Sequence, residues 1–293
     1  MDSSINTLTS ASLRIDISSL GAELKSIIDT SDQEYLWQAE PSFWSRRAPI
    51  LFPIVGALKE GKYSYQGKEY QLSQHGFARD KKFSVLSCSD KQVTYRLTED
   101  ELTLKNYPFR FILDVCYRLE GNRLDIEYRV ANPSTESLWF SIGGHPAFSL
   151  NWGVEHNISD YYLEFSDTEA VDAALIENKL LGKPSLSVFR AGRYIDLSDI
   201  LFDRDALIFT KHLSRKVTLK NKYSTAALSV SFDDFPHLGI WSKPNAPFVC
   251  IEPWQGHLDT IDHNSELTEK AGIVCLPPNQ HYQASYSIEI NPA

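Results

Sequence analysis

Two histidines and one glutamate occupy short turns in which acid–base chemistry is possible. His145 lies between a glycine pair and a proline, directly after the apolar run 138–142, and His75 precedes a glycine. Glu252 ends the apolar run 248–251 and precedes a proline. An imidazole, which titrates near pH ~6.5, and a carboxylate can exchange protons with a substrate at neutral pH. The sequence therefore predicts a site for general acid–base catalysis.

The residues that flank Glu252 and His145 support this prediction. Pro253 restricts Glu252 to an extended backbone and is expected to end the strand there, so that the carboxylate can face a cleft. Gly143 and Gly144 are expected to let the backbone of the histidine turn approach a ligand. Two structural alternatives stay open: Glu252 in water or in an ion pair at a strand end, and His145 as a core histidine bonded to backbone.

The composition is that of an ordinary globular protein, and the charge excludes several classes of partner. Of 293 residues, 42% are hydrophobic, which is ample material for a core. The net charge is −9, and such a field repels phosphate backbones and anionic lipids. Neither nucleic acid nor a membrane is therefore expected as a partner. Segment 1–16 lacks the regions of a secretory signal and no apolar run approaches ~18 residues, so a cytoplasmic location is expected.

The spacing of cysteines and histidines predicts no metal site. None of the cysteines forms a C-x-x-C pair, and we expect free, buried thiols at Cys88, Cys116, Cys250 and Cys275. The histidines in polar or turn-like surroundings are mostly expected at the surface: His156, His212, His237, His257, His263 and His281. The motifs H-E-x-x-H and G-x-S-x-G are absent, so neither metal-dependent hydrolysis nor serine hydrolase chemistry is predicted.

Alternating apolar and polar residues predict β-strands along most of the chain. The alternation is clearest in segments 124–130, 228–232 and 282–290. Turn residues at 120–122 and 66–67 predict two hairpins. Many strands separated by turns predict an all-β fold, a large antiparallel sandwich.

Helices are expected to be few and short. Segment 98–101 has the pattern of a capping box and predicts a short helix that stops before Pro108. Segment 167–181 is at most weakly helical. The glycines and prolines are spread over the chain and do not form a linker, so residues 1–293 are predicted to form a single domain.

Seven short motifs follow one another in an order that is typical of one protein family. They are LGAEL at 20–24, APILFPIVG at 48–56, HGFAR at 75–79, YPF at 107–109, GGHPAF at 143–148, DAL at 205–207 and EPW at 252–254. Each motif is weak alone, but seven in order form a specific signal. The chain resembles the aldose 1-epimerase (galactose mutarotase) superfamily, most of all its LacX-like branch. The resemblance implies an antiparallel β-supersandwich and chemistry without a cofactor or metal.

The resemblance also implies roles for individual residues. Glu252 matches the general base of the family, and His145 matches its general acid. His75 matches a second active-site histidine, and Asp205 matches an aspartate that binds sugar hydroxyls. These four residues are therefore expected in one site.

Two further residues are predicted to bind the substrate. Arg79 lies close behind His75 and supplies a positive charge, and Trp254 supplies an aromatic face for a sugar ring. One position departs from the family pattern, because this chain carries Ala57 where many relatives carry an arginine that reaches the sugar. Three other cations are candidates to replace that arginine: Arg47, Lys59 and Arg79.

Together these residues predict an enzyme that interconverts the α and β anomers of a hexose by opening and closing the sugar ring. Glu252 would act as the base and His145 as the acid. The expected partner is a small-molecule sugar, and both a monomer and a homodimer stay open.

Three alternatives stay open. A hexose-6-phosphate epimerase would use a cationic pocket, for which the candidates are Arg46, Arg47, Arg79, Lys81 and Lys82. A non-catalytic sugar-binding protein on the same fold would bind a hexose without exchanging its anomers. A glycosidase would need a second carboxylate about 5–10 Å from the first, and Asp205 is the only candidate in a motif.

Overall fold

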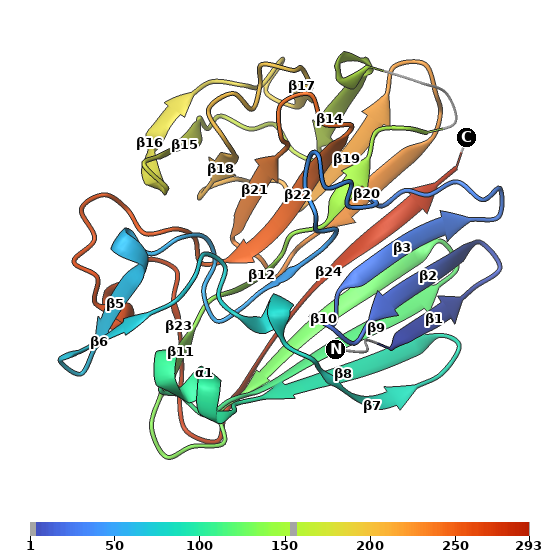
Figure 1. Cartoon of the computed structure of the whole chain (residues 1–293). Helices are drawn as coiled ribbons and strands as arrows, with labels where there is room; N and C mark the ends of the chain where they lie inside the picture. Colours follow the sequence, from blue (N-terminus) through green and yellow to red (C-terminus); the bar gives the residue numbers. More distant parts are fainter. Residues whose placement is uncertain (1–3, 153–156, 293) are drawn as a thin grey trace.

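Antiparallel β-sheets make up most of the molecule, as Figure 1 shows for the computed structural model. The structure describes residues 4–152 and 157–292. Within these ranges every pairing between named strands is antiparallel. The predicted all-β class with antiparallel sheets is therefore confirmed.

The largest sheet has nine strands. In spatial order they are β17 (Tyr194–Asp196), β14 (Tyr161–Phe165), β19 (Lys216–Asn221), β20 (Ala227–Ser231), β24 (His281–Asn291), β10 (Arg123–Ala131), β9 (Ile112–Glu120), β8 (Gln92–Thr98) and β7 (Ser84–Cys88). In β10 the apolar residues Ile126 and Tyr128 are fully buried, whereas Asp125 and Glu127, which alternate with them, are partly exposed. The alternation that predicted this strand thus separates a core face from a wetter face.

A second sheet lies over one end of the first (Figure 1). Its strands are β16 (Leu180–Leu186), β15 (Ala173–Glu177), β18 (Leu207–Phe209), β21 (His237–Trp241), β22 (Phe248–Gln255), β12 (Ile142–Gly144) and β4 (Ile50–Leu51), with β13 (Ala147–Ser149) also paired to β22. In β22, Val249 and Ile251 belong to the main core. The alternate residues Cys250, Glu252 and Trp254 therefore face the opposite side of this sheet.

Three small sheets and a few short helices complete the fold. The small sheets consist of β1 (Ile5–Thr9), β2 (Leu13–Ser18) and β3 (Leu24–Asp29), of β5 (Lys62–Tyr65) and β6 (Lys68–Gln71), and of β11 (Leu138–Phe140) and β23 (Val274–Leu276). The helices are α1 (Glu101–Asn106) and the 3₁₀ turns η1 (Lys59–Gly61), η2 (Ala78–Asp80), η3 (Ile158–Asp160) and η4 (Leu267–Glu269). The strands β5 and β6 form the hairpin that was predicted around residues 66–67.

α1, the one α-helix among the described residues, begins later than the predicted capping box implies. Asp100 is the N-cap, and its side chain accepts a hydrogen bond of 2.7 Å from the backbone N–H of Thr103. The Thr103 hydroxyl accepts a return bond of 2.8 Å from the backbone N–H of Asp100. Thr98 is still part of β8, so the predicted cap position was wrong by two residues. Segment 167–181 contains the strand β15 rather than a helix, because its apolar residues pack into a sheet.

Pro253 does not end its strand, contrary to the expectation from sequence. β22 continues to Gln255 on both sides of the proline. The backbone N–H of Ile251 points toward the carbonyl of Pro146 at 3.3 Å, in the gap between β12 and β13. The backbone of residue 253 faces the same way as that of Ile251. The N–H that proline lacks would therefore point to the turn between β12 and β13, where fewer backbone carbonyls need a hydrogen-bond donor.

The predictions for the remaining cysteines and histidines were only partly correct. All four cysteines are free, as expected, but Cys88 and Cys275 are exposed and only Cys250 is fully buried. His212 and His257 are buried rather than at the surface, since each ring bonds a backbone carbonyl. His156 lies outside the described residues. No helix in the described ranges is long and apolar enough to cross a membrane.

Candidate active site

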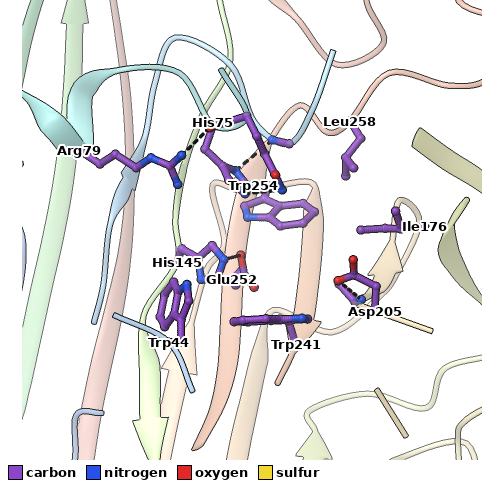
Figure 2. Close-up of a pocket in the computed structure, with 13 residues that line it drawn as sticks. Trp44, His75, Arg79, His145, Ile176, Asp205, Trp241, Glu252, Trp254 and Leu258 are labelled. Atoms are coloured by element: carbon purple, nitrogen blue, oxygen red, sulfur yellow. Dashed lines mark hydrogen bonds and ion pairs between the residues drawn. The ribbon is translucent and has the colours of Figure 1, made fainter. Parts of the chain in front are cut away.

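A pocket of about 280 Å³ opens on the side of β22 that faces away from the main core (Figure 2). Its lining includes all six residues that were predicted for the site: His75, Arg79, His145, Asp205, Glu252 and Trp254. The rest of the lining consists of Trp44, Gly56, Gln74, Ile176, Ala206, Trp241 and Leu258. The fold thus gathers predicted residues from four separate segments around one cavity.

His145 and Glu252 form the centre of the pocket. Nε2 of His145 lies 3.2 Å from Oε2 of Glu252, and their side chains are 10% and 2% exposed. Glu252 comes from β22, whereas His145 comes from the turn between β12 and β13. Figure 2 shows Asp205 on the far side of Glu252 from the imidazole. The two predicted acid–base groups therefore touch each other inside a nearly dry site.

Burial shifts the two groups toward their neutral forms. It raises the pKa of Glu252 well above its usual range, and the negative charge of Asp205 raises it further. Burial lowers the pKa of His145 to about 3, and the nearby cations Arg79 and Arg46 act in the same direction. Because the groups are in contact, they titrate as a unit. Between its two titration steps this unit holds one proton.

The glycines beside the histidine make room for neighbouring protein groups rather than for a ligand. A Cβ on Gly143 would lie 2.7 Å from Cδ1 of Trp254 and 2.8 Å from the carbonyl oxygen of Pro253. A Cβ on Gly144 would lie 2.7 Å from the hydroxyl of Tyr286. The packing therefore does not support the expectation that this backbone approaches a ligand. The glycines instead allow the histidine turn to lie tightly between β22 and β24.

His75 is held as a neutral hydrogen-bond donor. Its backbone has a φ of 67°, which is uncommon for a residue with a side chain. It is bound to Gly56 twice: its own N–H donates to the Gly56 carbonyl at 2.9 Å, and the Gly56 N–H donates to its Nδ1 at 3.1 Å. Burial and the nearby His145 lower its pKa well below the usual range. Since Nδ1 accepts a bond, the proton of this neutral ring is on Nε2.

Arg79 is the one cation in the lining of the pocket. Its Nη2 donates to the carbonyl of Gln74 at 2.7 Å, which fixes the guanidinium at the rim. Ala57 does not line this pocket. The Lys59 amine donates to two backbone carbonyls of the loop after β22, and Arg47 donates to a carbonyl of another loop. Of the three candidates to replace the family arginine, only Arg79 reaches the site.

Three tryptophans form the aromatic walls. The Trp44 ring stacks on His145, with ring centroids 4.9 Å apart and an angle of 26° between the planes. Trp241 meets the same imidazole edge-on at 5.8 Å. The indole of Trp254 lies against Gly239. A Cβ added at Gly239 would be 2.6 Å from the six-membered ring of the indole. These faces supply apolar surface beside a polar centre, as a sugar ring requires.

Unpartnered polar atoms cluster around this pocket. Among the described residues, ten buried side-chain nitrogen or oxygen atoms lack a hydrogen-bond partner. Four of the ten belong to the lining: Nε of Arg79, Nδ1 of His145, Oε2 of Glu252 and Nε1 of Trp254. Buried polar atoms are normally paired. Such a concentration in one cavity points to a ligand rich in hydroxyl groups.

Several lining residues were not identified from the sequence. Trp44 lies in a loop and Ile176 and Leu258 are ordinary apolar residues, so no pattern distinguishes them from core positions. Gln74 directly precedes the HGFAR motif, and this neighbourhood was its only signal in the sequence.

Comparisons with known proteins agree with the geometry. Residues 4–273 match the family model described as Aldose 1-epimerase. The chain is 35% identical over 288 residues to the plasmid-borne protein LacX of Lactococcus lactis subsp. lactis, which covers 95% of this chain and 96% of that protein.

Solved structures give the same result. A galactose mutarotase related enzyme from Lactobacillus acidophilus has a TM-score of 0.93 and 36% identity, covering 98% of this chain and 97% of that one. A galactose mutarotase-like protein from Lactobacillus casei has a TM-score of 0.91 and 30% identity, covering 98% and 100%. The match to the family model spans most of the chain, and the resemblance seen in the sequence motifs is confirmed: the chain belongs to the aldose 1-epimerase family.

Proposed function

We propose that this chain is an enzyme that interconverts the α and β anomers of an unphosphorylated hexose. The observation that carries the proposal is the contact of 3.2 Å between the buried His145 and Glu252 in a pocket walled by tryptophans. Membership of the aldose 1-epimerase family supports the reaction type. It leaves the sugar and the roles of the residues to be tested.

In the proposed reaction Glu252 removes the proton from the C1 hydroxyl of the sugar. The C1–O5 bond breaks, a carbonyl forms at C1, and His145 protonates O5. Rotation about the C1–C2 bond turns the carbonyl, and O5 then attacks its other face with the two residues in reversed roles. The two oxygens that exchange protons are bonded to the same carbon. An acid and a base that touch each other therefore suit this reaction better than groups on opposite sides of the ring.

The single proton held by His145 and Glu252 explains how the catalytically active form of the pair, a carboxylate and an imidazolium, arises. Burial favours a neutral Glu252 and a neutral His145 in the empty pocket. The working form, a carboxylate and an imidazolium, contains the same single proton. It is reached by moving that proton across the contact, and no proton has to enter from solvent. The proposed reaction also leaves the proton count of the pair unchanged, because the sugar loses one proton at O1 and gains one at O5.

The remaining lining residues would hold the sugar. Asp205 accepts hydrogen bonds from hydroxyl groups, while Arg79 and Nε2–H of His75 donate to oxygens. Trp254 and Trp241 offer apolar faces to the ring. Asp205 has a φ of 73°, so its backbone is constrained in an uncommon conformation at the pocket edge. This arrangement would fix C1 beside the acid–base pair.

The charges around the pocket favour a free hexose over a hexose phosphate. Two of the other cations proposed for a phosphate pair with acids outside the lining: Arg46 with Asp80 at 2.9 Å, and Lys81 with Asp100 at 2.8 Å. Within the lining, Arg79 is accompanied by the carboxylate of Asp205. That carboxylate would oppose the binding of a phosphate dianion.

Polarimetry of freshly dissolved α-galactose and α-glucose tests the proposal. The wild type should accelerate the exchange of at least one sugar, and Glu252→Gln and His145→Ala should each lose about 10²–10⁴-fold in rate. Glu120→Gln, an exposed carboxyl at the end of β9, is the matched control. Normal turnover by Glu252→Gln would contradict the assigned base.

The same assay separates the alternatives. Exchange of hexose 6-phosphates alone would identify a hexose-6-phosphate epimerase. Binding of a hexose without any exchange would identify a sugar-binding protein. The single domain over residues 1–293 and the cytoplasmic location stay predictions.

A further inference from the structure

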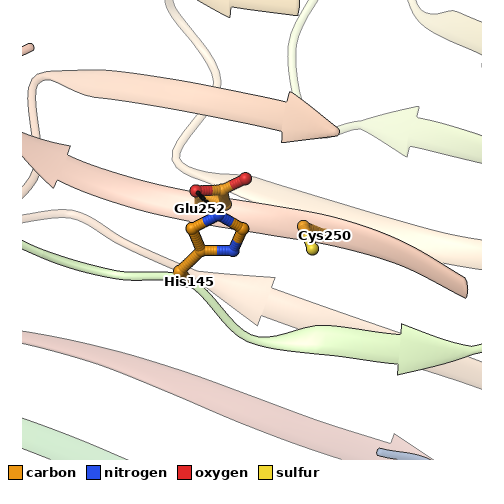
Figure 3. A group of neighbouring side chains, drawn as sticks. All are labelled: His145, Cys250 and Glu252. Atoms are coloured by element: carbon orange, nitrogen blue, oxygen red, sulfur yellow. Dashed lines mark ion pairs between the residues drawn. The ribbon is translucent and has the colours of Figure 1, made fainter. Parts of the chain in front are cut away.

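Cys250 lies directly beside the acid–base pair and has no part in the proposed reaction. One donor atom each from His145, Cys250 and Glu252 can be chosen so that all three lie within 4.8 Å of one another. Figure 3 shows the three side chains grouped beside β22, with the carboxylate and the thiol on two sides of the imidazole. A nitrogen, a sulfur and a carboxylate oxygen together form a typical ligand set for zinc.

The three donor groups are buried. Oε2 of Glu252 lies 3.2 Å from Nε2 of His145, Nδ1 of the same imidazole has no hydrogen-bond partner, and Cys250 is fully buried. His145 and Glu252 line the pocket, so the cluster is reached from the sugar-binding side. A tetrahedral zinc ion spaces its ligand atoms by about 3.5 Å. Side-chain rotations of roughly 1 Å would therefore bring the three donors into position.

We propose that His145, Cys250 and Glu252 form a binding site for a thiophilic divalent cation such as Zn²⁺, and that occupation of this site inhibits the enzyme. Three protein ligands leave one coordination position open toward the pocket, where water or a sugar hydroxyl would bind. The ion would take the electron pairs that the imidazole and the carboxylate need for proton transfer. The inhibition rests on the proposed function, whereas the binding of the ion does not.

Protons balance in the binding step. The thiol of Cys250 loses its proton as the Zn–S bond forms, Glu252 loses the proton that the pair holds, and the neutral imidazole coordinates directly. Two protons are released to solvent for each ion bound. Because binding releases protons, the affinity should rise with pH.

Cobalt titration of the intact chain tests the binding without any turnover. The exposed thiols are first removed with Cys88→Ser and Cys275→Ser. In this background Co²⁺ should give the near-ultraviolet absorption of a cobalt–thiolate bond at a ratio of one ion per chain, and Zn²⁺ should abolish it by displacement. Adding Cys250→Ser should remove the absorption and weaken Zn²⁺ binding by about 10–100-fold. Adding Cys116→Ser, at a half-buried cysteine of β9, is the matched control and should change neither.

Inhibition is measured with the same variants, each relative to its own rate without metal. Zn²⁺ should slow anomer exchange in the background chain, a chelator should restore the rate, and Cys250→Ser should be resistant. The absence of a thiolate band, or equal inhibition with and without Cys250, would overturn the proposal. A chain that binds Co²⁺ through Cys250 but exchanges no sugar would contradict the proposed function and leave the metal site standing.

Discussion

The Asp259 carboxylate and the Lys270 ammonium are 2.6 Å apart, and their side chains are 0% and 1% exposed. Asp259 also accepts a bond of 2.9 Å from the backbone N–H of Lys59 and exchanges backbone bonds with Ala57 and Leu181. One buried residue thus joins the loop that follows Gly56 to β16 through its backbone, and its carboxylate holds Lys59 and Lys270. These segments carry two walls of the pocket.

Removing the charge of Asp259 should destabilise the protein strongly. In Asp259→Asn the buried Lys270 ammonium loses its counter-charge, and breaking a buried pair in this way typically costs about 3–5 kcal/mol. Urea unfolding should show this loss. Asp114→Asn removes the partner of the more exposed Arg96 and should cost several-fold less. Equal losses in the two variants would mean that burial of the Asp259 pair has no special energetic weight.

Glu252→Gln should increase stability while it removes activity. The pKa of Glu252 is raised in the folded chain, so folding holds a proton that the unfolded chain releases above its ordinary pKa near ~4.5. Wild-type stability is therefore highest, in this respect, below pH ~4.5 and falls as the pH rises toward the folded pKa. Glutamine has no such dependence.

Thermal unfolding of wild type and Glu252→Gln across a pH series checks this effect. The two should unfold alike near pH ~4, and the advantage of the variant should then grow by about 1 kcal/mol per pH unit. Shifts from titrating groups that do not contact Glu252 cancel in the comparison. A variant that is less stable than the wild type at neutral pH would show that the carboxylate is stabilised as an anion in the folded chain.

The pH dependence of kcat/KM should be flat through the ordinary range of histidine. The pair of His145 and Glu252 keeps its single proton until the pH exceeds the raised pKa of Glu252, and it takes a second proton only as the pH falls toward about 3. Activity should therefore fall on the alkaline side as Glu252 loses its proton, with no acidic limb near pH ~6.5. An acidic limb centred near pH ~6.5 would show that His145 takes its catalytic proton from solvent.

Gly239→Ala should displace the indole of Trp254. The added Cβ would lie 2.6 Å from two carbons of the six-membered ring, and overpacking of this kind costs about 1–3 kcal/mol. The same change should lower sugar affinity, because Trp254 lines the pocket. Trp254→Phe removes the clashing atoms, so the stability loss from Gly239→Ala should be much smaller in that background. Additive losses in the double variant would place the strain elsewhere.

Much of the fold and the six site residues could be predicted from the sequence, for identifiable reasons. The strands of the nine-stranded sheet are half-buried, and alternation in 124–130 and 282–290 reports that directly. The six residues lie in ordered motifs whose spacing resembles a known family. A motif specifies which residues are present but says little about how they pack.

The rest depended on contacts between distant segments. Trp44 reaches the pocket because its loop folds against the sheet that contains β22, and Ile176 reaches it because β15 joins the same sheet. The continuation of β22 through Pro253 depends on where β12 and β13 stop beside it. The proximity of Cys250 to His145 follows from pairing of two strands that are far apart in sequence. Local periodicity carries no information about such neighbours.

Cys250, Glu252 and Trp254 occupy alternate positions of β22, so a change in the register of this strand would remove all three from the site together. Because side chains alternate between the faces of a sheet, a slip of one residue between β21 and β22 would turn all three away from the pocket and point Val249 and Ile251 into it. A sheet with this slip would therefore lack Glu252 at the site, although His145 comes from another segment. Recovery of anomerase activity on refolding would then report the pairing of these two strands, and an inactive but compact refolded fraction would be one in which they are misaligned.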